Sequence, residues 1–148
     1  MRKTLFVLNM ILIIILVACS QSSRDKAGSS SKDIVGTWNG KTSQNYYMRV
    51  GVEIVNGSPT VTEIWYQGIL IRVNSTHVIE QSNSYSTEKI SENIKDGKFS
   101  YSGDDYEVSG SFKDKTLKGN LSATYTDSQF GQKIKVNVPF NLTKVDSL

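Results

Sequence analysis

Apolar and polar residues alternate with a period of two along most of the chain between residues 33 and 145. In the segment "YMRVGVEIV", residues 47–55, one face carries Met48, Val50, Val52 and Ile54, and the other carries mainly polar side chains. Successive side chains of a β-strand point to opposite faces of the sheet, so this pattern predicts a half-buried strand.

The longest alternation lies near the end of the chain, in "KIKVNVPFNL", residues 133–142. Its apolar positions are Ile134, Val136, Val138, Phe140 and Leu142. Pro139 interrupts the polar face, and because proline has no backbone N–H, we expect an exposed side or a bulge there. The segments 106–112 and 117–125 alternate in the same way and predict two further strands.

Turn residues separate these strands at short intervals. Asn56-Gly57 and Asp96-Gly97 are dipeptides favoured in type I′ hairpin turns, and polar residues at 103–105 and 113–115 mark two more turns. No apolar stripe with helical spacing extends beyond two turns. The sequence therefore predicts an all-β domain: an antiparallel up-and-down meander of about eight strands, closed as a small barrel, with a β-sandwich as the alternative.

The first 32 residues have a different character. "MRK" is followed by an apolar run from Leu5 to Val17, which is shorter than the roughly 20 residues that a membrane-spanning helix needs. This is the layout of a signal peptide, assigned to residues 1–18. Residues 20–32 contain six serines and no large apolar side chain, which predicts a flexible tether with a reach of about 20 Å. Residues 33–148 then form a single domain.

The junction between these segments resembles the lipobox of bacterial lipoprotein precursors, because Leu16-Val17-Ala18 precedes Cys19, the only cysteine. The resemblance implies cleavage after Ala18 and a lipid on the Cys19 sulfur, so the expected partner is a membrane. It also implies a location on the extracytoplasmic face of the cell membrane, or at the outer membrane if the host has two. Several acyl chains on one residue hold a protein at a bilayer. An ordinary signal peptide with a free cysteine is the alternative.

Composition excludes several classes of function. Removal of Arg2 and Lys3 with the leader leaves 15 basic against 14 acidic residues, which does not suit a nucleic-acid-binding domain. His77 is the only histidine, so a zinc cluster lacks ligands, and no Gly-x-Ser-x-Gly motif is present. The acidic group Asp104, Asp105 and Glu107 is typical of a solvated turn. We therefore expect no cofactor, no metal and no enzymatic activity.

The domain begins with Gly36-Thr37-Trp38, which resembles the G-x-W entry to the first strand of lipocalins and of the smaller avidin-like barrels. The resemblance implies that Trp38 closes the base of a barrel and packs under a basic side chain from near the last strand, for which Lys144 is placed. A large core aromatic without family meaning is the other interpretation of Trp38.

Aromatic residues are the remaining candidates for function. In the pairs Tyr46-Tyr47 and Trp65-Tyr66, one ring of each pair should face inward and the other outward. The candidate ligand-binding residues are Trp38, Trp65, Tyr47 and Tyr101. Two hypotheses follow: a non-catalytic interaction or structural protein of the cell envelope that meets an envelope protein or wall polymer, or a lipocalin-like barrel that holds a small apolar or aromatic ligand against Trp38, Trp65 and inward tyrosines.

Overall fold

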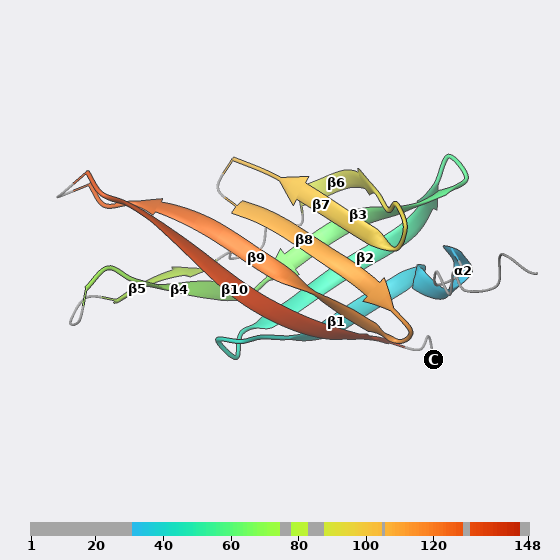
Figure 1. Ribbon diagram of the computed structural model, residues 1–148, viewed down its shortest axis with the longest axis horizontal. Helices are drawn as coiled ribbons and strands as arrows, with labels where there is room; N and C mark the ends of the chain where they lie inside the picture. Colours follow the sequence, from blue (N-terminus) through green and yellow to red (C-terminus); the bar gives the residue numbers. More distant parts are fainter. Residues whose placement is uncertain (1–30, 75–77, 83–87, 105, 129–130, 146–148) are drawn as a thin grey trace, which may run out of the picture.

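The computed structural model describes residues 31–74, 78–82, 88–104, 106–128 and 131–145. In these ranges a one-turn helix precedes ten strands (Figure 1). The elements are α2 (Ser31–Ile34), β1 (Gly36–Thr42), β2 (Tyr47–Val55), β3 (Ser58–Tyr66), β4 (Gly68–Arg72), β5 (Val78–Ser82), β6 (Glu88–Asn93), β7 (Lys98–Ser102), β8 (Tyr106–Lys113), β9 (Thr116–Thr126) and β10 (Lys133–Lys144). The predicted signal peptide and most of the predicted tether, with Cys19, lie outside the described residues.

Eight strands form one antiparallel sheet in the order β6-β3-β2-β1-β10-β9-β8-β7. The first and last strands of the domain, β1 and β10, pair at its centre, with Trp38 opposite Lys144. Strands β6 and β7 lie at the two edges and are consecutive along the chain, joined by a tight turn in which Lys95 and Lys98 exchange two backbone hydrogen bonds of 2.9 Å. The sheet is therefore nearly closed into a small lipocalin-like barrel, and the predicted all-β meander is confirmed.

The hairpin turns have the backbone conformation that their residues predict. Asn56 and Gly57 both have positive φ, at 52° and 80°, and Asp96 and Gly97 have φ of 50° and 69°. Two consecutive residues with positive φ define a type I′ turn, whose twist matches that of the flanking strands. The first turn joins the paired strands β2 and β3, and the second joins the edge strands β6 and β7 through the Lys95–Lys98 bridge.

The barrel interior is filled by the apolar face of each strand. Met48, Val50 and Val52 of β2 are buried, as are Val138, Phe140 and Leu142 of β10, whereas Ile134 and Val136 are partly buried against the core. Ile54 was expected on the buried face of β2, but it is 51% exposed. It stands one residue before the end of β2 at the β2–β3 turn, beyond the reach of the core.

Pro139 is accommodated where the neighbouring strand ends. Its carbonyl oxygen accepts a 2.7 Å hydrogen bond from the Ser43 amide, one residue after β1 ends at Thr42. The nitrogen and carbonyl of a strand residue point toward the same neighbour, so the absent N–H of Pro139 faces the end of β1. The predicted exposed side at Pro139 is therefore found, and no ladder bond along β1 is lost.

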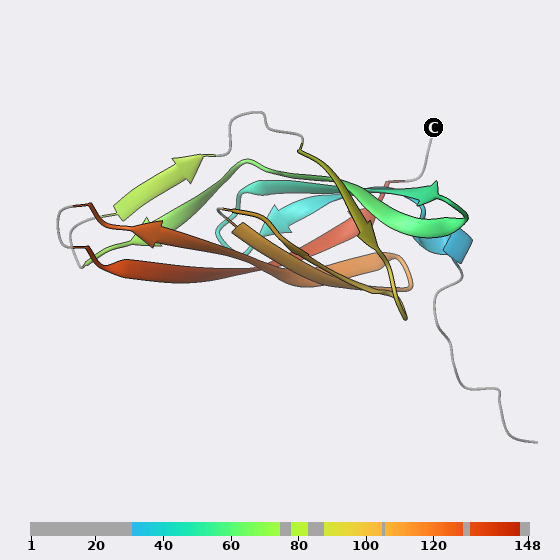
Figure 2. The ribbon, with the colours of Figure 1, turned by 90° about the horizontal axis from the view of Figure 1, so that it is seen from above.

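The remaining two strands, β4 and β5, form a separate hairpin inserted between β3 and β6. Ile69 and Ile71 of β4 are fully buried, and Ile79 of β5 packs against the core. Figures 1 and 2 both show this hairpin beside the far ends of β9 and β10, and β4 contacts β10. The hairpin thus extends the core beyond the barrel at the end opposite α2.

The chain enters the domain at the other end, where α2 and the C-terminal segment lie (Figures 1 and 2). The indole Nε1 of Trp38 donates a 2.9 Å hydrogen bond to the Ile34 carbonyl, and Lys144 Nζ donates a 2.8 Å bond to the Asp33 carbonyl. Trp38 of the first strand and Lys144 of the last strand therefore hold α2 at this end. Among the described residues, no helix is long and apolar enough to cross a membrane.

Candidate functional site

The four predicted ligand-binding residues do not converge on one site. Trp38 is completely buried, with its ring 5.0 Å from that of Phe112 in an edge-to-face arrangement. Tyr101 is partly buried beside the core, with its ring 5.5 Å from that of Tyr106. Tyr47 is 57% exposed on the outside of the barrel.

Trp65 also lies outside, so it does not line the interior with Trp38 as the ligand-cavity hypothesis supposed. Its neighbour Tyr66 is the inward ring, only 3% exposed and 5.3 Å from Tyr106 between ring centroids. The prediction that one ring of this pair faces inward is correct. The inward position falls to Tyr66 because Trp65 pairs with the outward-facing Arg49 of β2.

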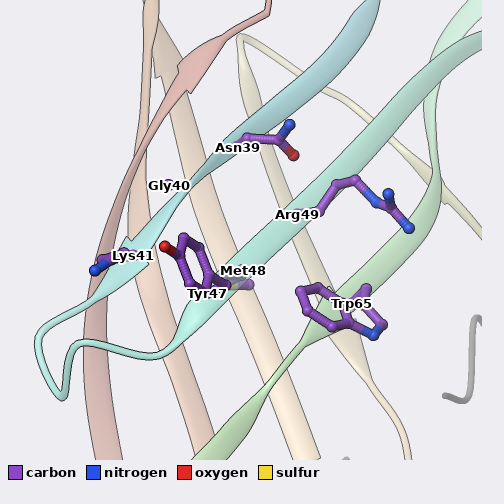
Figure 3. Close-up of a pocket in the computed structure, with 7 residues that line it drawn as sticks. All are labelled: Asn39, Gly40, Lys41, Tyr47, Met48, Arg49 and Trp65. Atoms are coloured by element: carbon purple, nitrogen blue, oxygen red, sulfur yellow. The ribbon is translucent and has the colours of Figure 1, made fainter. Parts of the chain in front are cut away.

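Tyr47 and Trp65 come together on the outer surface of β1, β2 and β3, which we call the aromatic wall. Its outward side chains are those of Asn39, Lys41, Tyr47, Arg49 and Trp65, which Figure 3 shows, and that of Glu63. Strand register places Asn39, Arg49 and Trp65 in one row across the three strands, and Lys41 beside Tyr47 in the next row. An open groove of about 540 Å³ runs between them.

Each ring of the groove carries a cation. Lys41 Nζ lies 4.8 Å from the centroid of the Tyr47 ring, and the Arg49 guanidinium carbon lies 5.8 Å from that of Trp65. A cation over an aromatic face is attracted by the electron density of the ring. Each cation therefore favours the observed position of its ring.

Arg49 is held in turn by Glu63. One carboxylate oxygen of Glu63 accepts a 3.0 Å hydrogen bond from Arg49 Nε and forms a 2.7 Å ion pair with one terminal nitrogen of the guanidinium. Gly51 provides the space, because a β-carbon there would lie 3.1 Å from the Glu63 β-carbon. The series of contacts from Gly51 to Glu63, from Glu63 to Arg49 and from Arg49 to Trp65 therefore holds one side of the groove in place.

The turn that precedes the groove, between β1 and β2, joins the aromatic wall to the β4–β5 hairpin. The side-chain amide of Gln44 pairs with the backbone of Leu70 through two hydrogen bonds, of 2.9 and 2.8 Å, as a neighbouring strand would. Tyr46 donates a 2.8 Å hydrogen bond to Glu80. This bond, followed by desolvation and the Glu80 charge, raises the pKa of Tyr46 above its ordinary value near 10.

The opposite side of the barrel carries a different surface, which we call the polar wall. Its outward side chains are those of Ser100, Ser102, Glu107, Ser109, Asn120 and Ser122 on β7, β8 and β9, and they line a smaller groove of about 320 Å³. Glu107 forms an ion pair of 2.8 Å with Lys135, in which both side chains are about half exposed. No exposed ring stands on this wall among the described residues.

Within the described ranges, no three histidine, cysteine, aspartate or glutamate side chains are placed to hold a metal ion. His77 and Asp105 lie outside the described residues. Glu107, from the acidic group considered above, pairs with Lys135 on an open surface.

Sequence reasoning missed most of the residues that surround the two rings of the aromatic wall: Asn39, Lys41, Arg49, Gly51 and Glu63. Alternation marks Arg49 as outward, but it does not tell which strand lies beside β2 or in which register. Comparison with known proteins adds no further assignment: no protein-family model matches the chain, and neither a curated protein nor a solved structure matches it significantly.

Proposed function

We propose that this chain is a lipid-anchored, extracytoplasmic β-domain that works as a non-catalytic interaction protein of the cell envelope. The signal-peptide layout and the lipobox ending at Cys19 support the anchor. Binding takes place on the outside of the barrel, with the aromatic wall as the contact surface.

The observation that carries this proposal is the contrast between a filled interior and an open outer groove. Inside the barrel, Trp38, Met48, Leu117, Leu121 and Leu142 are among the completely buried side chains. An eight-stranded barrel can be filled by its own side chains in this way. On the outside, Tyr47 is exposed and Trp65 is half-buried. Both line an open groove, and each has a cation over its ring. The structure therefore gives less support to a small ligand inside the barrel than to a partner bound on its outer surface.

The position of α2 at one end of the barrel suggests how the domain would be oriented relative to the membrane. The described domain begins at α2, so a tether that precedes it would attach at the α2 end and turn that end toward the membrane (Figure 1). Lys41 lies near the other end of β1, and at about 3.3 Å per residue it stands roughly 17 Å from Gly36 along the strand. The groove then lies on the half of the barrel that is remote from the lipid surface.

The anchor is tested by the mass and location of the full chain purified from its own host in detergent. We expect a mature species that begins at Cys19 and carries acyl chains, and a Cys19→Ser variant that is no longer held in the membrane fraction. A mature protein that starts elsewhere or has no lipid would remove the anchor from the proposal.

The outer-surface interaction is tested against the ligand-cavity alternative by native mass spectrometry of the same detergent-solubilised chain. We expect the mass of the lipidated polypeptide with no additional non-covalent component. A component that organic solvent removes would favour a small apolar ligand inside the barrel. Photo-crosslinking from a position beside Trp65 in intact cells should label an envelope component; labelling of none would contradict an interaction role.

A further inference from the structure

The groove of the aromatic wall has the features of a site for sugar rings, which goes one step beyond an unspecified interaction surface and rests on the proposed function. Tyr47 is 57% exposed and Trp65 half-buried, and both belong to a rigid sheet. Trp65 is directly opposite Arg49, two residues after Tyr47, so the two rings are diagonal neighbours on adjacent strands. Lys41 and Arg49 stand over one face of each ring, and the opposite faces are the flat apolar surfaces that the C–H faces of consecutive sugars in a chain would match.

Polar atoms border these rings where sugar hydroxyl and amide groups would lie. The exposed side-chain amide of Asn39 makes no hydrogen bond within the described part of the chain, and it offers both a donor and an acceptor. Arg49 uses Nε and one terminal nitrogen on Glu63, which leaves the N–H groups of its other terminal nitrogen for a ligand. A few polar groups beside aromatic carbon are typical of binding sites that fix the orientation of a ligand.

The charge of the groove favours an acidic ligand. Lys41 and Arg49 are both at the rim, and among the described side chains around the groove Glu63 is their one acidic neighbour, which leaves one net positive charge. Lys41 donates one hydrogen bond, of 2.9 Å, to Asn45 Oδ1 and retains further N–H donors. A carboxylate on the ligand would complement this charge at the edge of the groove.

The shape and position of the groove favour a polymer over a small free sugar. The groove is open rather than enclosed, so a chain can enter and leave across the strands. The site stands roughly 17 Å along β1 from the α2 end, and the predicted tether adds a reach of about 20 Å. Both distances carry the groove away from lipid headgroups and toward polymers outside the membrane.

We infer that the groove between Lys41, Tyr47, Arg49 and Trp65 binds an acidic polysaccharide of the cell envelope. The sugar rings stack on Tyr47 and Trp65, Asn39 hydrogen-bonds their substituents, and Lys41 and Arg49 pair with carboxylates. A protein partner at this surface is the competing outcome of the test.

The experiment measures binding by the full lipidated chain in detergent to two soluble glycans of equal length. One is a peptide-free wall glycan of alternating N-acetylglucosamine and N-acetylmuramic acid, which carries a carboxylate on every second sugar. The other is a chitin oligosaccharide, which has the same backbone without carboxylates. We expect the carboxylated glycan to bind more tightly, and Tyr47→Ala and Trp65→Ala each to weaken it about tenfold or more.

Matched variants separate stacking, charge and folding. Ile54→Ala removes an exposed apolar side chain of the same strand outside the groove and should leave the affinity unchanged. Lys41→Gln should abolish the preference for the carboxylated glycan, whereas Lys118→Gln, at the polar side of the barrel, should not. Trp65→Phe retains a flat ring and should recover part of the affinity lost in Trp65→Ala, which a folding defect would not allow.

The outcomes distinguish this inference from the proposed function. Absence of binding to both glycans, equal affinity for the two, or unchanged binding by Trp65→Ala would each overturn the acidic-polysaccharide assignment. If glycans fail and crosslinking beside Trp65 labels an envelope protein, the proposed function stands and the inference falls. If neither a glycan nor a protein is bound, both are wrong.

Discussion

The aromatic wall and the polar wall are built on the same barrel, yet they offer different chemistry to the outside. Inward positions on both sides hold apolar side chains such as Val50 and Leu121. Outward positions hold rings and paired cations on β1–β3, but serines and Asn120 on β7–β9. Because alternate strand positions face opposite sides, the core fixes one half of each strand and leaves the other half available for a binding surface. The two walls therefore share the inward half that stabilises the fold and differ only in the outward half of their strands.

The largest effect should come from a glycine that faces the interior. At Gly119 on β9, a β-carbon would collide with the Ser109 carbonyl oxygen and stand 2.5 Å from Phe140 Cζ. We expect Gly119→Ala to destabilise the domain by about 1–3 kcal/mol or more, as overpacked cores do. Urea denaturation measures the change.

Gly51→Ala provides the matched comparison on the aromatic wall. Its β-carbon would meet only the Glu63 side chain, at 3.1 Å, on the outer surface. The cost should be clearly smaller than for Gly119→Ala, and the main consequence should be a displaced Arg49 and weaker ligand binding. Equal losses of stability in the two variants would contradict the division into an inward structural half and an outward functional half.

Removal of the Gln44 side chain should have the next largest effect. Gln44→Ala leaves the part-buried amide and carbonyl of Leu70 without their partners, which should cost about 1–3 kcal/mol. Faster hydrogen exchange at the Leu70 amide would report the loss directly. Gln67→Ala, which removes a more exposed amide with one 3.3 Å contact to Tyr47, should change exchange at Leu70 little. If the Leu70 amide exchanges at the same rate in both variants, the Gln44 side chain does not hold β4 in place.

Double-mutant cycles on the two exposed ion pairs give a smaller effect and a direct comparison of the walls. The side chains of Arg49 and Glu63 are 43% and 31% exposed, whereas those of Lys135 and Glu107 are 52% and 55% exposed. Exposed pairs contribute about 0.2–1 kcal/mol at most. We expect Arg49–Glu63 to lie within that range, because Trp65 and the hydrogen bond from Nε orient it, and Lys135–Glu107 to lie near zero. Stronger coupling on the polar wall would reverse the comparison.

The smallest effect concerns alkaline pH. The pKa of Tyr46 is raised by its hydrogen bond to Glu80, so the folded state favours the protonated phenol. The resulting stability is fully present below the ordinary pKa near 10 and is lost as pH rises through the raised value. The urea midpoint should therefore fall more between about pH 8 and pH 11 in the parent protein than in Tyr46→Phe. An identical fall in both would show that this contact does not stabilise the folded state.

Much of the fold could be predicted because short-range patterns encode it. Alternation over 47–55 and 133–142 identified two strands, and Asn56-Gly57 and Asp96-Gly97 identified two type I′ turns. The β4–β5 hairpin was not predicted. Its strand β4 contacts β10, which is far away along the chain.

The candidate site was predictable only in part. Tyr47 and Trp65 were named as ligand candidates, but they were expected with Trp38 in a cavity rather than with Lys41 and Arg49 on the outside. In β3 the alternation is broken by a register shift between Val61 and Glu63. Thr60 and Val61 are both buried there, so the phase of Trp65 cannot be read from the residues before it.

The sequence by itself determined the period of the strands, the positions of the turns and the layout of the leader, because each depends on residues that are close along the chain. The tertiary structure decided which ring of the Trp65-Tyr66 pair faces outward and which side chains stand beside it. Those choices depend on the register of Asn39, Arg49 and Trp65 across three strands. The β2–β3 register shifts at a bulge between Gly51 and Val52, and β1 is placed by its pairing with β2 and β10; no local sequence pattern contains either.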